Sequence, residues 1–124
     1  MADIFVDANV LMALTENKPN LYRQQLGAHN VFISPLSVHI LAYVQKLSMP
    51  HPSIESLLEH FSLVDLTYAI VTKASAGPMR DMEDNIQLHS AATANCDYFL
   101  TGDKELLKMA FFGKTRVVSS LGPA

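Results

Sequence analysis

The chain alternates short apolar runs with longer stretches of helical pattern, and this alternation most limits the folds open to it. Five short runs, each bounded by turn or capping residues, are predicted to be strands: residues 4–6, 31–33, 63–66, 98–100 and 116–118. The stretches between them carry helix-favouring residues or apolar residues at helical spacing: 8–15, 21–26, 35–48, 54–61, 68–74, 84–95 and 103–108. Strands that alternate with helices, without a clear hairpin signal, predict an α/β fold in which helices cover both faces of a parallel sheet.

Chain length and composition predict one domain spanning residues 1–124. At 124 residues and 49% hydrophobic content, the chain can bury one sizeable core but is too short for two ordinary domains. The net charge of -3 gives no global attraction to a phosphate backbone, so any affinity for nucleic acid must be local. The single cysteine, Cys96, excludes an intramolecular disulfide and is expected to be a small buried residue.

The first residues do not resemble a secretion signal. Asp3 and Asp7 stand where a signal peptide would need basic residues, and no apolar run in the sequence is long enough to cross a membrane. We therefore expect a cytoplasmic protein with no membrane partner.

Three acidic residues fall where a parallel sheet gathers its functional groups. Asp7 ends the strand 4–6, Asp103 follows the strand 98–100, and Asp84 stands at the start of a predicted helix. The loops at the carboxyl ends of parallel strands converge, so these carboxylates would meet and repel one another unless a cation lay between them. Oxygen ligands suit Mg²⁺ or Mn²⁺, and the histidines and the cysteine offer no zinc spacing. Such a site suits phosphodiester hydrolysis.

Helix capping is the alternative explanation for two of these residues. An Asp at the start of a helix usually accepts hydrogen bonds from free backbone N–H groups, which would account for Asp84 and Asp103 without any metal. Asp7 is different, because it directly follows the apolar run 4–6, where an unpaired carboxylate would be costly.

Three blocks of the sequence resemble the PIN domains, a family that includes the toxin subunits of many bacterial type II toxin-antitoxin pairs. The blocks are IFVDANVL at 4–11, DMEDNIQ at 81–87 followed by Ala91, and DYFLTGD at 97–103. The resemblance covers nearly the whole chain and implies a three-layer α/β/α sandwich with a five-stranded parallel sheet.

The same resemblance implies an activity and a set of site residues. Asp7, Asp84 and Asp103 would be both the metal ligands and the catalytic carboxylates, supported by Asn9 and Thr101. The activity would be endoribonuclease cleavage with Mg²⁺ or Mn²⁺ and an attacking water. An antitoxin covering the acidic cleft and a second copy of the chain would be the protein partners.

One position departs from the family pattern. The helix that follows the second strand commonly carries a Glu, and we assign that position to His39. This histidine is either a metal ligand or a polar residue pointing into the cleft, while Asp81 and Glu83 could replace the missing charge or be solvated loop acids. Asn9 could likewise simply cap the first helix. Without the Glu, a degenerate PIN domain that binds RNA or a protein partner is the second hypothesis.

A receiver-like domain that accepts a phosphoryl group is a third possibility. That fold would ordinarily place paired acids at the first strand and a lysine after the last. Here Asp3 and Asp7 bracket one strand and residues 116–120 contain no lysine, so the sequence disfavours it.

Overall fold

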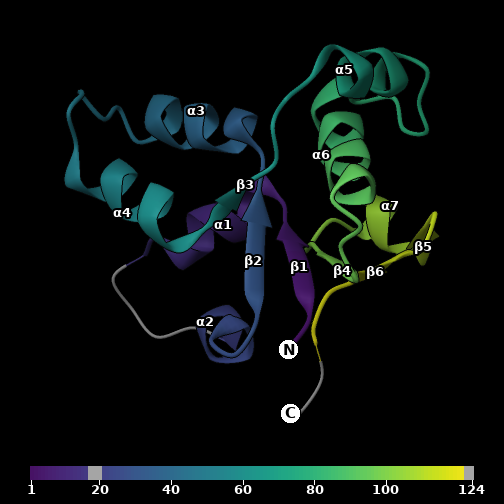
Figure 1. Cartoon of the computed structure of the whole chain (residues 1–124), viewed down its shortest axis with the longest axis horizontal. Helices are drawn as coiled ribbons and strands as arrows, with labels where there is room; N and C mark the ends of the chain where they lie inside the picture. The colour runs from purple at the N-terminus through teal and green to yellow at the C-terminus, as the bar shows by residue number, and fades with distance from the viewer. Residues whose placement is uncertain (17–20, 122–124) are drawn as a thin grey trace.

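The computed structural model describes residues 1–16 and 21–121, which form one twisted sheet with helices on both sides (Figure 1). In chain order the elements are β1 (Asp3–Val6), α1 (Ala8–Leu14), α2 (Leu21–Leu26), β2 (Asn30–Ile33), α3 (Pro35–Val44), α4 (Pro52–His60), β3 (Ser62–Leu63), α5 (Tyr68–Ser75), α6 (Met82–Thr93), β4 (Tyr98–Leu100), α7 (Lys104–Leu107), β5 (Phe111–Phe112) and β6 (Thr115–Val118). The predicted helix break at residues 17–19 lies outside the described residues.

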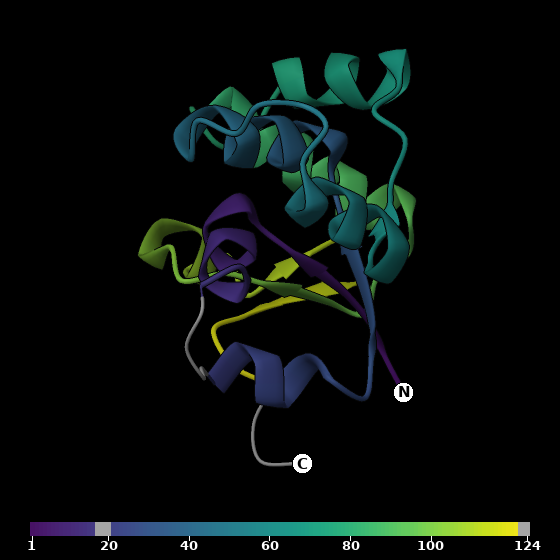
Figure 2. The same cartoon turned by 90° about the vertical axis from the view of Figure 1, so that its left-hand side faces the viewer.

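Side chains of β1 alternate between two separate cores, which divide the helices into two layers. Ile4 and Val6 pack with buried residues of α1, α2, α3 and α4, whereas Phe5 packs with those of α5, α6 and α7. Figure 2 views the molecule from the side of α1 to α4. A strand buried on both faces needs an unbroken apolar run, and residues 4–6 provide one. The three-layer α/β/α architecture is therefore confirmed.

Four of the five predicted strands lie where they were predicted, while the strand predicted at 63–66 is the shorter β3 (Ser62–Leu63) and shares only Leu63 with that range. All five are parallel, and one further strand was missed. The sheet order is β3-β2-β1-β4-β6-β5, and only β5 runs antiparallel to its neighbour. The β5–β6 hairpin turns at Gly113, which adopts the left-handed φ of 62° that such a tight turn requires. A strand of two residues leaves no alternating pattern to recognise, so the prediction of a sheet without a hairpin was wrong at this edge.

Helices α3 and α4 end or begin away from their predicted positions. α3 stops at Val44 and not near Ser48, because Lys46 adopts a left-handed φ of 55° and the Leu47 N–H returns to the Ala42 carbonyl at 2.9 Å. α4 begins at Pro52, so its cap is His51, whose Nδ1 accepts the Ser53 N–H at 3.1 Å. Ser53, the predicted cap, lies inside the helix.

The helices of this fold are short. The longest in the described part of the chain, α6, has 12 residues. Across residues 1–16 and 21–121, no helix is both long enough and apolar enough to cross a membrane.

Candidate functional site

Asp7 occupies the carboxyl end of the central strand, where its side chain is almost completely buried. It is the N-cap of α1, and its Oδ1 accepts the Val10 N–H at 2.8 Å. Its other oxygen, Oδ2, accepts the Thr101 hydroxyl at 2.5 Å. Asp7 is only 5% exposed and Thr101 is 0% exposed. Asp7 is buried as the sequence predicted, and hydrogen bonds to both carboxylate oxygens offset the free-energy cost of that burial.

Thr101 also contacts the segment that carries Asp103, another of the predicted carboxylates. Its Oγ1 accepts the Asp103 N–H at 3.0 Å, while Asp103 Oδ1 accepts the Glu105 N–H at 2.8 Å as the N-cap of α7. The capping explanation for Asp103 is therefore correct as far as Oδ1 is concerned. A single buried hydroxyl links the ends of β1 and β4, the two adjacent strands that carry Asp7 and Asp103.

The capping explanation for Asp84 is wrong, because α6 starts earlier than the sequence pattern predicted. Asp81 is the N-cap, and its Oδ1 accepts the Asp84 N–H at 3.0 Å. Asp84 is the third residue of the helix and its carboxylate is not needed to cap it. Glu83, which we also considered as a loop acid, lies in the first turn of the helix and is half-buried.

The surroundings of Asp7 raise the pKa of its carboxyl above the ordinary value. Burial is the largest cause, and the charge of Asp103 acts in the same direction. The hydrogen bonds from the Thr101 hydroxyl and from the backbones of Val10 and Asn9 lower the pKa and offset part of this rise. Asp7 is consequently a buried carboxyl group held in place by hydrogen-bond donors, with a further negative charge nearby.

The carboxyl groups on α6 experience the same negative field. Burial, then the charges of Asp81, Asp103, Glu83 and Asp7, raise the pKa of Asp84 to about 6. Burial, followed by Asp81 and Asp7, also raises the pKa of Glu83. The structure thus brings acids from the ends of β1 and β4 and from the start of α6 into one region, and the charges that shift these pKa values are all negative.

The chemistry of this region suits a divalent cation, although the side chains are not arranged around one. Carboxylate oxygens with uncompensated charge are the ligands that Mg²⁺ and Mn²⁺ prefer. Among residues 1–16 and 21–121, no group of three or more His, Cys, Asp or Glu side chains is arranged to hold a metal ion. The donor set therefore fits the metal in kind and charge but not in arrangement.

The side chains of two predicted supporting residues lie outside this network. Asn9 is exposed, and since Asp7 caps α1, the alternative that Asn9 caps it is wrong. His39 is exposed on α3 and is not among the groups that shift the pKa values of the carboxyls. The side of α3 that contacts α6 carries the buried Ser37, whose hydroxyl donates to Gln87 Oε1 at 3.5 Å.

Sequence reasoning missed Gln87, a buried polar residue at the base of the site. Its Oε1 accepts the Ala8 N–H at 2.8 Å and the Ser37 hydroxyl at 3.5 Å, and it is 1% exposed. The sequence carried a signal for this role. Gln87 is a polar residue between the apolar Ile86 and Leu88, and it lies three positions after Asp84, on the same side of the helix.

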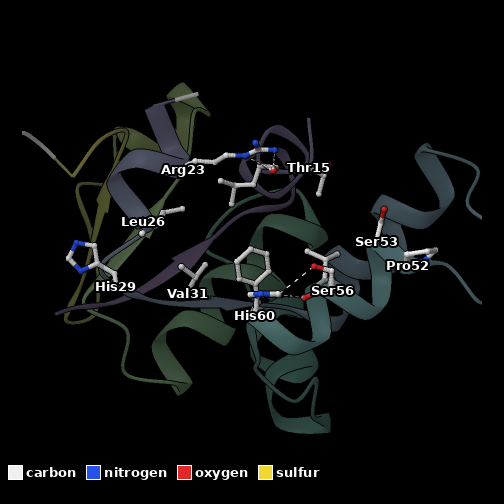
Figure 3. A pocket seen from close by; sticks show the side chains of 13 residues that line it. Thr15, Arg23, Leu26, His29, Val31, Pro52, Ser53, Ser56 and His60 are labelled. Carbon is white, nitrogen blue, oxygen red and sulfur yellow. Dashed lines mark hydrogen bonds between the residues drawn. The ribbon is translucent and has the colours of Figure 1, made fainter. Parts of the chain in front are cut away.

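A pocket of about 700 Å³ lies elsewhere on the molecule, between α1, α2, β2 and α4 (Figure 3). Figure 3 shows Leu26 and Val31 lining it together with Arg23, His29 and His60. None of the acidic residues of the site contributes to its wall. Its lining does not provide the carboxylates on which the expected chemistry depends, so the acidic region remains the candidate site.

A three-layer α/β domain with a mostly parallel sheet defines the open-sheet α/β class, whose functional crevice lies at the carboxyl ends of the strands, where the acidic side chains gather here. The particular family follows from a family-model match. The model of the PIN domain matches residues 4–112, and the chain belongs to the PIN domain family.

Solved structures share the fold at low sequence identity. VapC20 of Mycobacterium tuberculosis, described as a Sarcin-Ricin loop cleaving toxin, superposes with a TM-score of 0.66 at 12% identity, over 91% of this chain and 98% of that chain. VapBC2 of Rickettsia felis, bound to a promoter DNA fragment, gives 0.67 at 14% identity, over 94% and 97%. FitAcB of Neisseria gonorrhoeae gives 0.53 at 17% identity, over 81% and 87%. A search of curated proteins found no match.

Proposed function

We propose that this protein is a metal-dependent endoribonuclease of the toxin type, folded as a single PIN domain over residues 1–124. The observation that carries the proposal is the link between Asp7, Thr101 and Asp103, which lies in the electrostatic field of Asp84. These are the positions that the PIN resemblance assigns to metal ligands and their support. Membership of the family adds the expectation of nuclease chemistry.

Each residue has a distinct part in this proposal. Asp7, Asp84 and Asp103 would hold Mg²⁺ or Mn²⁺, which when bound lowers the pKa of a water and neutralises charge that develops on a phosphodiester. Thr101 fixes the orientation of Asp7, as groups behind a metal ligand commonly do. Asp81 holds the first turn of α6 in place and adds negative charge beside Asp84.

The proposed partners are an RNA substrate, an antitoxin and a second copy of the chain. One solved relative is described as a toxin that cleaves the Sarcin-Ricin loop, and another is a VapBC2 structure bound to promoter DNA. A chain with net charge -3 does not attract RNA over its whole surface, so bound metal would supply the local attraction. We place this activity in the cytoplasm.

The direct test is RNA cleavage by the purified protein in Mn²⁺. We expect Asp7→Asn to reduce cleavage by at least about a hundredfold, since the amide keeps the shape of the side chain but removes its charge. Asp65→Asn, an exposed acid outside the site, is the matched control and should cleave normally. Full cleavage by Asp7→Asn would remove Asp7 from the proposal.

A degenerate PIN domain that binds RNA or a protein is the second candidate. The observation in its favour is that the described side chains form no ready group of three metal ligands. Calorimetric titration with Mn²⁺ separates the two candidates. Binding that is lost in Asp84→Asn supports the nuclease, whereas RNA binding without any Mn²⁺ binding at millimolar concentration supports the degenerate domain.

A further inference from the structure

Gln87 is a buried carboxamide that connects three elements around the acidic site. Its Oε1 accepts the Ala8 N–H of α1 at 2.8 Å and the Ser37 hydroxyl of α3 at 3.5 Å. Its Nε2 donates to Glu83 Oε2, one turn earlier on α6, at 3.5 Å. An apolar residue in this 1% exposed position would leave the Ala8 N–H and the Ser37 hydroxyl without their acceptor.

We infer that Gln87 is a positioning residue, which holds the first peptide of α1, and with it the Asp7 carboxylate, in fixed relation to the acids on the first turn of α6. This inference rests on the proposed function for its consequence in metal binding. The connection is short: Ala8 directly follows Asp7, and Gln87 stands three residues after Asp84 on the same helix. One side chain therefore joins two segments that are 79 positions apart in the sequence.

The bond to Ala8 complements the cap that Asp7 itself provides. The first N–H groups of a helix have no partner within the helix. Asp7 takes the Val10 N–H, and Gln87 takes the Ala8 N–H. The start of α1 is thus fixed from its own N-cap and from α6, so the Asp7 carboxylate has little freedom to turn away from the site.

A buried carboxamide could also serve stability alone, and α6 offers a matched residue for that role. Asn85 is 3% exposed and forms three hydrogen bonds, accepting the Met79 N–H at 2.8 Å and donating to the Ala74 and Met79 carbonyls at 2.9 Å. It binds α6 to the end of α5 and the segment that follows, and none of these three hydrogen bonds involves α1. Replacing Asn85 removes a buried amide from the same helix without touching the support of Asp7.

The test compares Gln87→Met with Asn85→Leu in two measurements on the full chain. The first is amide hydrogen exchange without metal, normalised to the strand amides of Phe5 and Phe99. In Gln87→Met we expect the amides of Ala8 and Val10 to exchange at least about fivefold faster, as loss of local hydrogen bonds predicts. Asn85→Leu should leave the normalised rates at these two amides unchanged.

The second measurement is Mn²⁺ affinity by calorimetry. We expect Gln87→Met to weaken binding about tenfold, as removal of groups behind metal ligands does, and Asn85→Leu to change it less than about twofold. Gln87→Glu keeps the oxygen that accepts the Ala8 N–H and should restore the slow exchange of Ala8. If Gln87→Met does not fold, Gln87→Asn, whose shorter side chain cannot reach Ala8, replaces it.

The outcomes separate this inference from the proposed function. Unchanged exchange at Ala8 and Val10 in Gln87→Met, or an equal acceleration in Asn85→Leu, would overturn the positioning role. Equal loss of Mn²⁺ affinity in the two variants would overturn it as well. If the unsubstituted protein binds no Mn²⁺, the proposed function fails, and the exchange measurement still decides whether Gln87 fixes Asp7.

Discussion

Replacing Thr101 with valine tests whether its hydroxyl supports a charged Asp7. The substitution keeps the shape of a side chain that is 0% exposed, so it leaves no sizeable cavity. It removes the 2.5 Å bond to the Asp7 carboxylate and the 3.0 Å bond from the Asp103 N–H. A hydrogen bond to a charged group contributes about 1.5–3 kcal/mol and a neutral one about 0.5–1.5 kcal/mol, so we expect a loss of about 2–4.5 kcal/mol.

Thr115→Val is the matched control for this measurement. Thr115 is also buried, at 2% exposed, but its hydroxyl donates to a neutral acceptor, the Cys96 carbonyl, at 2.8 Å. Its replacement should cost about 1 kcal/mol in urea unfolding at pH 8 without metal. Equal losses in the two variants would refute a charge-supporting role for Thr101.

The pH dependence provides a second check on Thr101. The hydroxyl of Thr101 lowers the pKa of Asp7, so its removal raises that pKa further. The stability difference between the unsubstituted protein and Thr101→Val should therefore be largest where Asp7 is ionised and should shrink as the pH falls through its folded pKa. A difference that grows on acidification would contradict this assignment.

Three further predictions concern the other residues of the site. Folding raises the pKa of Asp84 from 3.8 to about 6, so the metal-free protein should lose stability as the pH rises through this window. Asp84→Asn should therefore be more stable than the unsubstituted protein in urea at pH 7, whereas Glu59→Gln on the exposed side of α4 should show no such gain. Asp103→Asn should keep the cap of α7, with unfolding changed by less than about 0.5 kcal/mol, yet weaken Mn²⁺ binding in calorimetry; unaltered binding would leave Asp103 with capping alone. His39→Ala should cleave RNA and bind Mn²⁺ within about twofold of the unsubstituted protein, because the side chain is exposed and outside the network; a larger loss would return His39 to the site.

The parallel core of the fold could be predicted because its strands are buried on both faces. Residues 4–6 and 98–100 are unbroken apolar runs, and such runs indicate central parallel strands directly. The β5–β6 hairpin could not be predicted, since it depends on a two-residue strand that gains its stability only by pairing with β6. The early end of α3 was missed because Lys46 takes a backbone conformation that is more typical of glycine.

The sequence predicted the position of Asp7 in the candidate site, but not the cap of α6 or the exposure of His39. The sequence placed Asp7 at the end of a buried strand, and a strand end is a local property. It could not show that Asp81 rather than Asp84 caps α6, because either acid has the composition of an N-cap. His39 was selected from the sequence pattern, whereas its exposure follows from how the turns of α3 face the sheet.

By itself, the sequence determined the alternation of strands and helices, the family blocks and the position of acids at strand ends. Only the tertiary structure decided which polar groups meet: the Thr101 hydroxyl with Asp7, and the Gln87 carboxamide with Ala8. The physical reason is that secondary structure follows from local propensity and hydrophobic period, whereas these bonds join residues 94 and 79 positions apart. Such distant groups meet only after the sheet has assembled and the helices have packed against it.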